Sequence, residues 1–304
     1  MNDNISRSES DTAPGARLKA LINSPDITIA PGIYDGFSAR LVEKMGFKTG
    51  AISGAGTSES RLGWADRGLM GFEENLDNAR RIADCTGLLL QADADTGYGN
   101  AVNVYFVVRA FEKAGMAAVM IEDQVWPKRC GHMAGKSVVP AEEMVAKIKA
   151  AVGARQSKDF FIIARTDARA VHGLDEALRR GEMYLEAGVD GLFIEAPQTV
   201  AELERVGRAF PGVPQIANML EGGGQTPFLP PRQLKQMGFA MAAYPTTLLF
   251  RVARTIERAL ADIRAGRPLD GGDGVNFAEF KSITNYDEWA RIEGEYAPGR
   301  GTAS

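Results

Sequence analysis

The sequence predicts an α/β protein with the fold of a (β/α)8 barrel of the TIM type. Three observations indicate this fold: eight short apolar, β-rich runs, an amphipathic helical pattern after most of them, and a spacing that places eight units in roughly 240 residues. Strands that alternate with helices form parallel sheets. Eight units at this length suit a closed barrel better than an open, doubly wound sheet.

The predicted strands are apolar runs that end in or near a polar residue or a proline. In chain order they are 27–31, 50–54, 88–93, 117–123, 160–167, 191–197, 214–219 and 239–245. Apolar residues recur at helical spacing in the segments that follow. These segments are 38–46, 72–85, 103–115, 141–154, 174–188, 200–210, 232–238 and 247–266. Glycines at the ends of several of them are typical of helix C-caps.

The two ends of the chain differ from the barrel. Residues 1–16 are small and polar, so we expect a flexible tail there. Residues 17–265 contain no linker and are predicted to form one catalytic barrel. Residues 266–304 begin with a Gly/Pro/Asp-rich connection and continue with apolar residues at helical spacing. We expect this C-terminal helical arm to cover an apolar surface of its own barrel or of a neighbouring subunit.

Composition excludes several classes of protein. The 35 basic and 39 acidic residues give a net charge of −4, so we expect neither nucleic acid nor a membrane as a partner. No apolar run reaches the roughly 18–20 residues of a transmembrane helix, and the first residues do not resemble a secretory signal. Two cysteines form no disulfide framework. We therefore expect a cytoplasmic protein.

Polar residues gather at the predicted C-terminal ends of the strands, where barrel enzymes place their chemistry. They are Asp35, Ser53, Asp93, Asp95, Glu122, Asp123, Arg165, Asp167, Glu195, Asn218, Glu221 and Tyr244. Burying so many carboxylates without a counter-charge costs several kcal/mol each. A divalent cation and the converging Arg165 would offset this cost. Because the donors are oxygens and no histidine cluster is present, they favour Mg²⁺, or Mn²⁺, over Zn²⁺.

The motif DADTGYG (93–99) is the most specific part of this pattern. Asp93 and Asp95 are two residues apart at a strand end, so both reach one site. Gly97 and Gly99 allow the backbone to turn tightly after them. The alternative is a turn in which the aspartates cap the next helix.

The segment 124–139 contains KRCGH (128–132) and has little apolar periodicity. Loops this long in compact domains are often lids over a site. Lys128, Arg129 and His132 surround Cys130, and we expect them to favour its thiolate or a readily shared proton. The alternative is a solvated basic loop with an incidental cysteine.

Together, these residues resemble the phosphoenolpyruvate mutase/isocitrate lyase superfamily. The resemblance runs from APGIYDGFSARLVEKMGF (30–47) to the last barrel helix. Its specific parts are SGAG (53–56), GWADRG (63–68), DADTGYG, IEDQVWPKRCGH (121–132), ARTDA (164–168), IEAP (194–197) and the strand that ends at Asn218. The cysteine in KRCGH marks the carbon–carbon lyase branch of the superfamily.

The resemblance implies roles for individual residues. Cys130 would be the general acid, and Arg165 would pair with a substrate carboxylate and the C2 oxygen. Asp93 would bind Mg²⁺ directly, while Asp66, Asp95 and Glu122 would hold its bound waters. The remaining substrate-binding residues would be Ser53, Gly54, Ala55, Gly131, His132, Glu195, Asn218 and Arg251.

The resemblance also implies an assembly. Members of the superfamily exchange their eighth helix with a neighbouring subunit, usually in a dimer of dimers. Residues 247–266 and the aromatic tail would form the exchanged arm, and the expected state is a homotetramer.

The implied reaction is retro-Claisen cleavage of a small 2-hydroxy dicarboxylate to an α-keto acid and a second carboxylate. Tricarboxylate lyases of the superfamily carry Ser or Thr just after the asparagine, whereas Met219 and Leu220 follow Asn218 here. This difference favours a 2-alkylmalate such as 2,3-dimethylmalate, cleaved to pyruvate and propionate, with Phe193 and Leu220 lining an alkyl pocket. The C2-hydroxyl base stays unassigned, because Ala51 stands where lyases of the superfamily often carry an aromatic residue.

Three alternatives remain open at this point. The first is 2-methylisocitrate lyase activity. The second is oxaloacetate hydrolase or decarboxylase activity, which Pro245 disfavours because such hydrolases tend to carry Ser there. The third is a non-catalytic barrel that binds keto acids.

Overall fold

The computed structural model describes residues 12–268, 272 and 274–297. They form two compact units, which divide between Arg251 and Val252 inside helix α11 (Thr247–Arg264). The first unit holds every strand of the described chain, and the second unit is helical.

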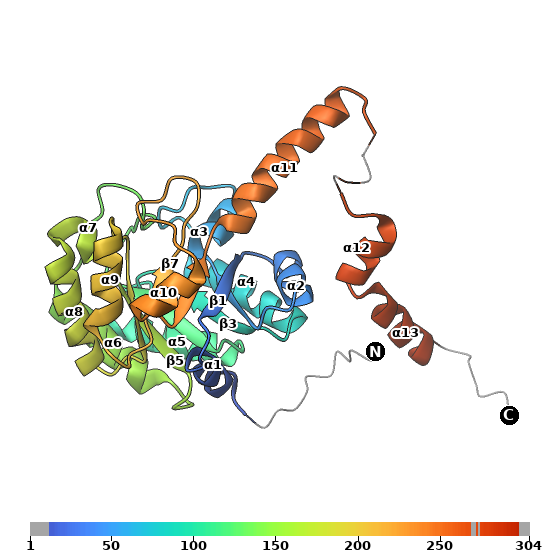
Figure 1. The fold of residues 1–304 in the computed structure, drawn as a ribbon. Coiled ribbons are helices and arrows are strands. Elements are labelled where there is room, and N and C mark those ends of the chain that lie inside the picture. Colours follow the sequence, from blue (N-terminus) through green and yellow to red (C-terminus); the bar gives the residue numbers. More distant parts are fainter. Residues whose placement is uncertain (1–11, 269–271, 273, 298–304) are drawn as a thin grey trace. The chain divides into compact units, whose positions relative to one another are not determined.

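Eight parallel strands make up the centre of the first unit (Figure 1). They are β1 (Thr28–Ile33), β2 (Thr49–Ile52), β3 (Leu89–Asp93), β4 (Ala118–Glu122), β5 (Phe161–Thr166), β6 (Gly191–Ile194), β7 (Ile216–Asn218) and β8 (Met241–Tyr244). Their order is β6-β5-β4-β3-β2-β1-β8-β7. A parallel bridge between Leu192 and Gln215 joins the two outer strands, so the sheet closes. The predicted (β/α)8 barrel is confirmed.

Helices surround the strands and lie close to their predicted bounds. They are α2 (Gly36–Lys44), α4 (Phe72–Cys85), α5 (Ala101–Lys113), α6 (Ala141–Ala154), α8 (Leu174–Glu186), α9 (Val200–Ala209) and α10 (Pro231–Met237). The last predicted barrel helix corresponds to α11, most of which belongs to the second unit. Four further helical segments were not predicted: α1 (Pro14–Ile22), α3 (Gly54–Thr57), the π-helical turn η1 (Ser58–Leu62) and α7 (Ala168–His172). Within the described residues, no helix is long and apolar enough to cross a bilayer.

Helix α1 explains why the site lies at the other end of the barrel. Leu18 and Ile22 of α1 are buried in one cluster with apolar residues at the starts of β3, β5, β7 and β8. This helix therefore closes the N-terminal end of the barrel. Pro14, its first residue, suits a helix start, so residues 14–16 of the predicted tail are helical. Residues 1–11 lie outside the described part.

Local caps set where the helices begin after each strand. The Asp35 side chain accepts from the Ser38 amide at 2.7 Å, and the Ser38 hydroxyl closes the capping box from the other side. Asn100 and Asn103 form the same arrangement at the start of α5. Such caps hold each helix directly after its strand, so the polar strand ends stay at one rim.

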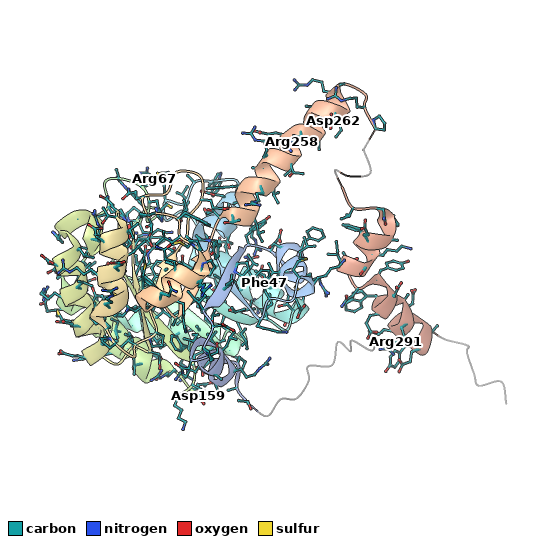
Figure 2. The ribbon with its side chains drawn as sticks, in the orientation of Figure 1. Phe47, Arg67, Asp159, Arg258, Asp262 and Arg291 are labelled. Carbon is teal, nitrogen blue, oxygen red and sulfur yellow. The ribbon has the colours of Figure 1, made fainter. Side chains whose placement is uncertain are left out.

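The second unit contains the rest of α11, α12 (Phe277–Ile283) and α13 (Tyr286–Tyr296). The predicted apolar helical pattern is split into these two helices because Asn285 adopts φ 52°, a left-handed conformation. Helix α11 buries none of its residues, and charged residues such as Arg258 and Asp262 project from it (Figure 2). Exchange of this arm between subunits stays a prediction.

The close packing of α9 against α10 yields a test of the fold. A methyl group added at Gly207 would collide with the backbone carbonyl of Met237. Gly207→Ala should therefore lower the free energy of unfolding by about 1–3 kcal/mol, as overpacking does. Gly153→Ala is the matched control, because nothing lies within 4 Å of a Cβ there; it should raise stability by about 0.5–1 kcal/mol. Urea unfolding checks both, and equal effects would contradict the packing.

Candidate active site

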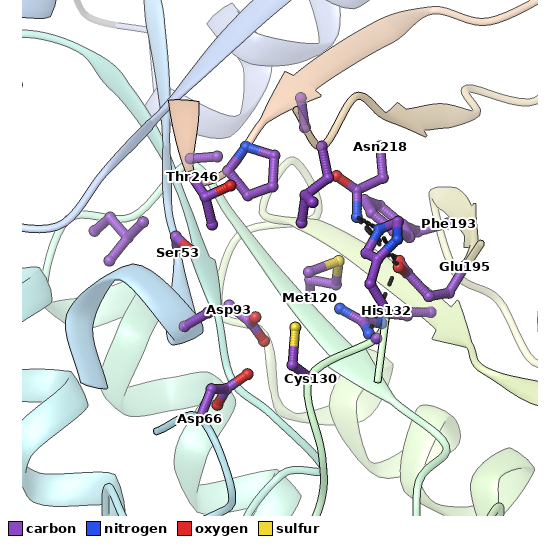
Figure 3. Close-up of a pocket in the computed structure, with 18 of the residues that line it drawn as sticks. Ser53, Asp66, Asp93, Met120, Cys130, His132, Phe193, Glu195, Asn218 and Thr246 are labelled. Carbon is purple, nitrogen blue, oxygen red and sulfur yellow. Dashed lines mark hydrogen bonds and ion pairs between the residues drawn. The ribbon is translucent and has the colours of Figure 1, made fainter. Parts of the chain in front are cut away.

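A cavity opens at the C-terminal ends of the strands and encloses about 660 Å³, part of it open to solvent. Ten residues predicted for the site line it (Figure 3): Ser53, Ala55, Asp66, Asp93, Cys130, Gly131, His132, Arg165, Glu195 and Asn218. Phe193 and Leu220, predicted for an alkyl pocket, also line it. Parallel strands thus bring together residues as far apart in the chain as Ser53 and Asn218.

Arg165 provides a fixed cation in this cavity. Its Nε lies 2.9 Å from Asp167 Oδ2 and 3.2 Å from Glu122 Oε2. Its guanidinium carbon lies 5.5 Å from the centre of the Phe193 ring. Burial alone would lower the pKa of Arg165, but the surrounding carboxylates raise it well above its ordinary value. The guanidinium is therefore permanently charged, and Asp167 and Glu122 set its orientation.

His132 of the loop 124–139, which we call the lid, pairs with Glu195 of the barrel. The Gln225 amide donates to His132 Nδ1 at 2.9 Å, so the ring proton is on Nε2, which donates to Glu195 Oε1 at 3.0 Å. Asn218 Nδ2 donates to the same carboxylate at 3.2 Å. Burial would raise the pKa of Glu195, but Arg165 and His132 outweigh it and hold the pKa well below its ordinary value. Glu195 is thus an ionised acceptor (Figure 3).

Lys128 lies among the acidic residues and pairs with them rather than with Cys130. We expected Lys128 to act on Cys130, but its ammonium pairs with Asp66 and, at 2.8 Å, with Asp95 Oδ1. Burial, together with Asp93 and Asp66, raises the pKa of Asp95 to about 6 although Lys128 opposes this. The Tyr98 hydroxyl donates to Asp95 Oδ2 at 3.3 Å. Asp95 is therefore held beneath the cavity and does not line it.

The acidic residues fit a Mg²⁺ site built largely through water. Within the described chain, no group of three or more His, Cys, Asp or Glu side chains is placed to hold a metal directly. Mg²⁺ commonly keeps several waters and uses only one or two carboxylates. Asp93 lines the cavity and can be such a ligand. Glu122 Oε1 is buried with no hydrogen-bond partner, as expected for an atom that would hold a metal-bound water.

Cys130 stands at the centre of the cavity, between Asp66 and Asp93 on one side and His132 on the other (Figure 3). Burial raises the pKa of its thiol, and the negative charges of Asp66 and Glu195 add to this effect. Of the two expected effects of the basic neighbours, the thiolate is disfavoured and a shared proton is favoured, because Lys128 pairs with Asp66 and Asp95 and Arg129 donates to the Ala134 carbonyl. A thiol that keeps its proton at neutral pH is suited to donate one.

A buried ion pair holds the lid down. Lys136 Nζ lies 2.7 Å from Asp167 Oδ1 and also donates to the carbonyl of Gly131, the residue after Cys130. The lid backbone approaches so closely that a Cβ at Gly131 would collide with Arg165 and Glu195. The motif therefore needs glycine here, and the Lys136–Asp167 pair sets the height of Cys130 above Arg165.

Three predicted residues lie just outside the cavity lining and one lies elsewhere. Gly54 packs against Asp93, where a Cβ would come within 2.9 Å of Oδ2, and Asp95 and Glu122 form the layer beneath. Arg251 is exposed on α11 and pairs with Glu221 Oε1 at 3.4 Å. The roles of Lys136 and Gln225 were not predicted, because irregular loops carry no periodic signal for them.

The chain matches the phosphoenolpyruvate phosphomutase family over residues 18–264. It is 41% identical to 2,3-dimethylmalate lyase of Eubacterium barkeri, over 94% of this chain and 99% of that protein. It is 39% identical to 2-methylisocitrate lyase of Aeropyrum pernix, over 93% of this chain and 91% of that protein.

Solved structures of the same superfamily have the same fold. Oxaloacetate acetylhydrolase in complex with 3,3-difluorooxalacetate superposes with a TM-score of 0.87 at 31% identity, covering 96% of this chain and 99% of that one. Phosphonopyruvate hydrolase in complex with oxalate and Mg²⁺ superposes with a TM-score of 0.81 at 27% identity, covering 94% and 99%.

The Lys136–Asp167 pair predicts a change in the exposure of Cys130. In a Cys85→Ser background, Lys136→Met should increase the rate of Cys130 alkylation by iodoacetamide about tenfold, since a charged hydrogen bond contributes roughly 1.5 kcal/mol or more. Lys158→Met removes an exposed lysine and is the control. Equal rates in the two variants would show that the pair does not hold the lid.

The raised pKa of Cys130 predicts a pH profile. Because burial disfavours the thiolate, the alkylation rate of Cys130 should rise with a midpoint above the ordinary value of 9.0. Asp66→Asn should lower the midpoint, since it removes a charge that raises this pKa. Stopped-flow alkylation from pH 6 to 11 measures both, and the urea-unfolded chain provides the reference. A midpoint below that reference would contradict the burial argument.

Proposed function

Because the chain belongs to the phosphoenolpyruvate phosphomutase family, we propose that it is a Mg²⁺-dependent carbon–carbon lyase acting on a small 2-hydroxy dicarboxylate. The observation that carries this proposal is that the Cys130 thiol and Arg165 line one cavity in a barrel mouth rich in carboxylates; burial raises the pKa of the thiol, which favours its protonated form. This pairing of an acid with a fixed cation suits a reaction in which negative charge develops on carbon.

Arg165 and the strand ends would orient the substrate. The cation is held by Asp167 and Glu122, so it can pair with a substrate carboxylate and the C2 oxygen without rearranging. The Ser53 hydroxyl and the backbone at Ala55 line the same cavity and would bind the carboxylate. Bound at Asp93, Mg²⁺ would polarise the C2 hydroxyl as a Lewis acid.

Cys130 would complete the cleavage. Loss of the C2-hydroxyl proton and formation of the C2 ketone break the C2–C3 bond and leave the electron pair on C3. The thiol proton of Cys130 then forms the new C3–H bond, and the thiolate regains a proton from solvent after the products leave. Residue 51 carries only a methyl group, so a group other than this side chain accepts the C2-hydroxyl proton.

The cavity walls favour an alkyl-substituted malate. Phe193, Leu220 and Met120 line the cavity with apolar surface, and Met219 is fully buried in the barrel wall. A third substrate carboxylate placed against Leu220 would receive no hydrogen bond from that side chain, and an unpaired carboxylate is costly to bury. We therefore propose 2,3-dimethylmalate, giving pyruvate and propionate, and its lyase is a relative at 41% identity.

The names of similar proteins suggest two other candidate substrates. The 2-methylisocitrate lyase relative is 39% identical, and oxaloacetate is the substrate named for a structural neighbour. Leu220 weighs against the first, and Pro245, which lines the cavity, weighs against the second. The relatives named are enzymes, which favours catalysis over binding alone.

The substrate proposal predicts a ranking. With Mg²⁺ present, kcat/KM should be highest for 2,3-dimethylmalate among 2-alkylmalates, 2-methylisocitrate, citramalate and oxaloacetate, and EDTA should abolish turnover. Leu220→Ser should raise the ratio of 2-methylisocitrate to dimethylmalate turnover, since it adds a donor for a third carboxylate. Cys130→Ser should lower kcat about 10²–10⁴-fold, and Cys85→Ser is the control. Exclusive use of 2-methylisocitrate, or full activity in EDTA, would refute the proposal.

We also propose that the protein is a cytoplasmic homotetramer that exchanges its C-terminal arms. Its two free cysteines suit a reducing compartment. Val252, Ile256, Leu260 and Ile263 form an exposed apolar stripe along α11 at helical spacing. Such a stripe on a stable protein is usually covered by another chain.

The assembly proposal predicts a change of mass. Ile256→Glu should shift the protein from a tetramer to smaller species in light scattering, because it places a charge on the stripe. Arg258→Glu, which changes an exposed residue of the same helix, should leave the mass unchanged. A wild-type monomer would contradict the proposal.

A further inference from the structure

A second cavity lies beside the base of the lid and shares no lining residue with the first. It encloses about 960 Å³, part of it open to solvent. Three segments form its walls: 96–99 after β3, 124–126 after β4, and 138–147 leading into α6. We propose that this cavity is a second binding site for a short-chain organic acid, with the carboxylate against Lys147 and Thr96 and the apolar chain against Trp126.

Lys147 is a buried cation that makes one long ion pair among the described residues. Only 4% of the residue is exposed. Its ammonium donates to the Thr96 carbonyl at 3.3 Å, and its nearest carboxylate, Glu143 Oε1, lies 3.7 Å away on a half-exposed side chain. Burial lowers the pKa of Lys147 more than Glu143 raises it. A ligand carboxylate would therefore find an ammonium that solvent does not reach.

Thr96 supplies the second polar contact. The residue is 1% exposed, and its hydroxyl oxygen has no hydrogen-bond partner in the part of the chain described. Buried hydroxyl groups are normally satisfied, so such a group at a cavity wall calls for a ligand or a water. Thr96 is also the residue whose carbonyl binds Lys147, so the hydroxyl and the ammonium lie close together.

The start of α6 adds a favourable field for an anion. No side chain caps this 14-residue helix, and the amides of Glu143 and Met144 bond to Pro140. The amides before them point out of the helix N-terminus, where anions are stabilised. Glu142 and Glu143 lie in the same first turn. They would repel a dianion such as phosphate, so a singly charged carboxylate is the better match.

The opposite wall is apolar. Trp126 is 42% exposed, and its ring centre lies 5.9 Å from that of Tyr98. Val125 is also exposed beside it. An alkyl chain placed on this wall would remove exposed apolar surface from water. One charged end and one apolar wall together define the ligand class.

The two cavities are linked by the base of the lid. Gln124 and Val138 form an antiparallel bridge across it, and the Gln124 side chain binds both the amide and the carbonyl of Arg129, next to Cys130. The second site nevertheless needs no activity at the first, so it can be tested whether or not the proposed function holds.

Hexanoate is the probe for this site, and calorimetry of the full chain measures its binding. We expect one hexanoate per chain, at least tenfold weaker binding in Lys147→Met, and unchanged binding in Lys149→Met, which removes an exposed lysine of the same helix. The neutral analogue 1-hexanol should bind at least tenfold more weakly than hexanoate. Thr96→Val, which removes only the hydroxyl, should also weaken binding and replaces Lys147→Met if that variant does not fold.

Tryptophan fluorescence provides a second measurement, which tests whether hexanoate binds next to Trp126. In a Trp64→Phe, Trp289→Phe background, Trp126 is the only remaining tryptophan of the three, and hexanoate should change its emission with the affinity that calorimetry gives. The proposal is overturned if hexanoate binds wild type and Lys147→Met equally, if Trp126 emission does not respond, or if a crystal structure shows side chains of a second copy filling the cavity.

Discussion

The carboxylate of Asp167 is the contact on which the site depends. One of its oxygens accepts from Arg165 Nε at 2.9 Å, and the other lies 2.7 Å from Lys136. The first contact fixes the Arg165 guanidinium at the C-terminal end of the barrel. The second contact holds the loop that carries Cys130 over it. A single residue at the end of β5 therefore sets the distance between the fixed charge and the thiol.

Asp167 is itself held by a buried network behind the strands. Asp123 accepts from the Asp167 amide at 2.9 Å, from the Thr166 hydroxyl at 2.7 Å and from Tyr184 at 2.7 Å, and Arg180 of α8 pairs with it at 3.0 Å. Buried ion pairs of this kind contribute little net stability. Their effect here is geometric, because they fix the strand ends relative to the helix layer.

Buried ion pairs also fix the acidic side of the cavity. Lys128 offsets Asp66 and Asp95, which leaves Asp93 at the cavity wall and Glu122 Oε1 without a partner. The charges of the barrel mouth are thus divided. One group is neutralised within the protein, and the other is available to a metal ion and a substrate.

The sequence by itself determined the alternation of strands and helices, and hence the barrel, because burial periodicity and caps such as Asp35 act over a few residues. It also placed the acidic residues, Arg165 and Cys130 at one rim, since parallel strands all end there. Only the tertiary structure decided which charges pair. Lys136 reaches Asp167 across 31 positions and Gln225 reaches His132 across 93. Arg251, which was expected in the site, is exposed and pairs with Glu221. Such long-range contacts depend on how the loops pack against each other, and no local pattern of residues encodes that packing.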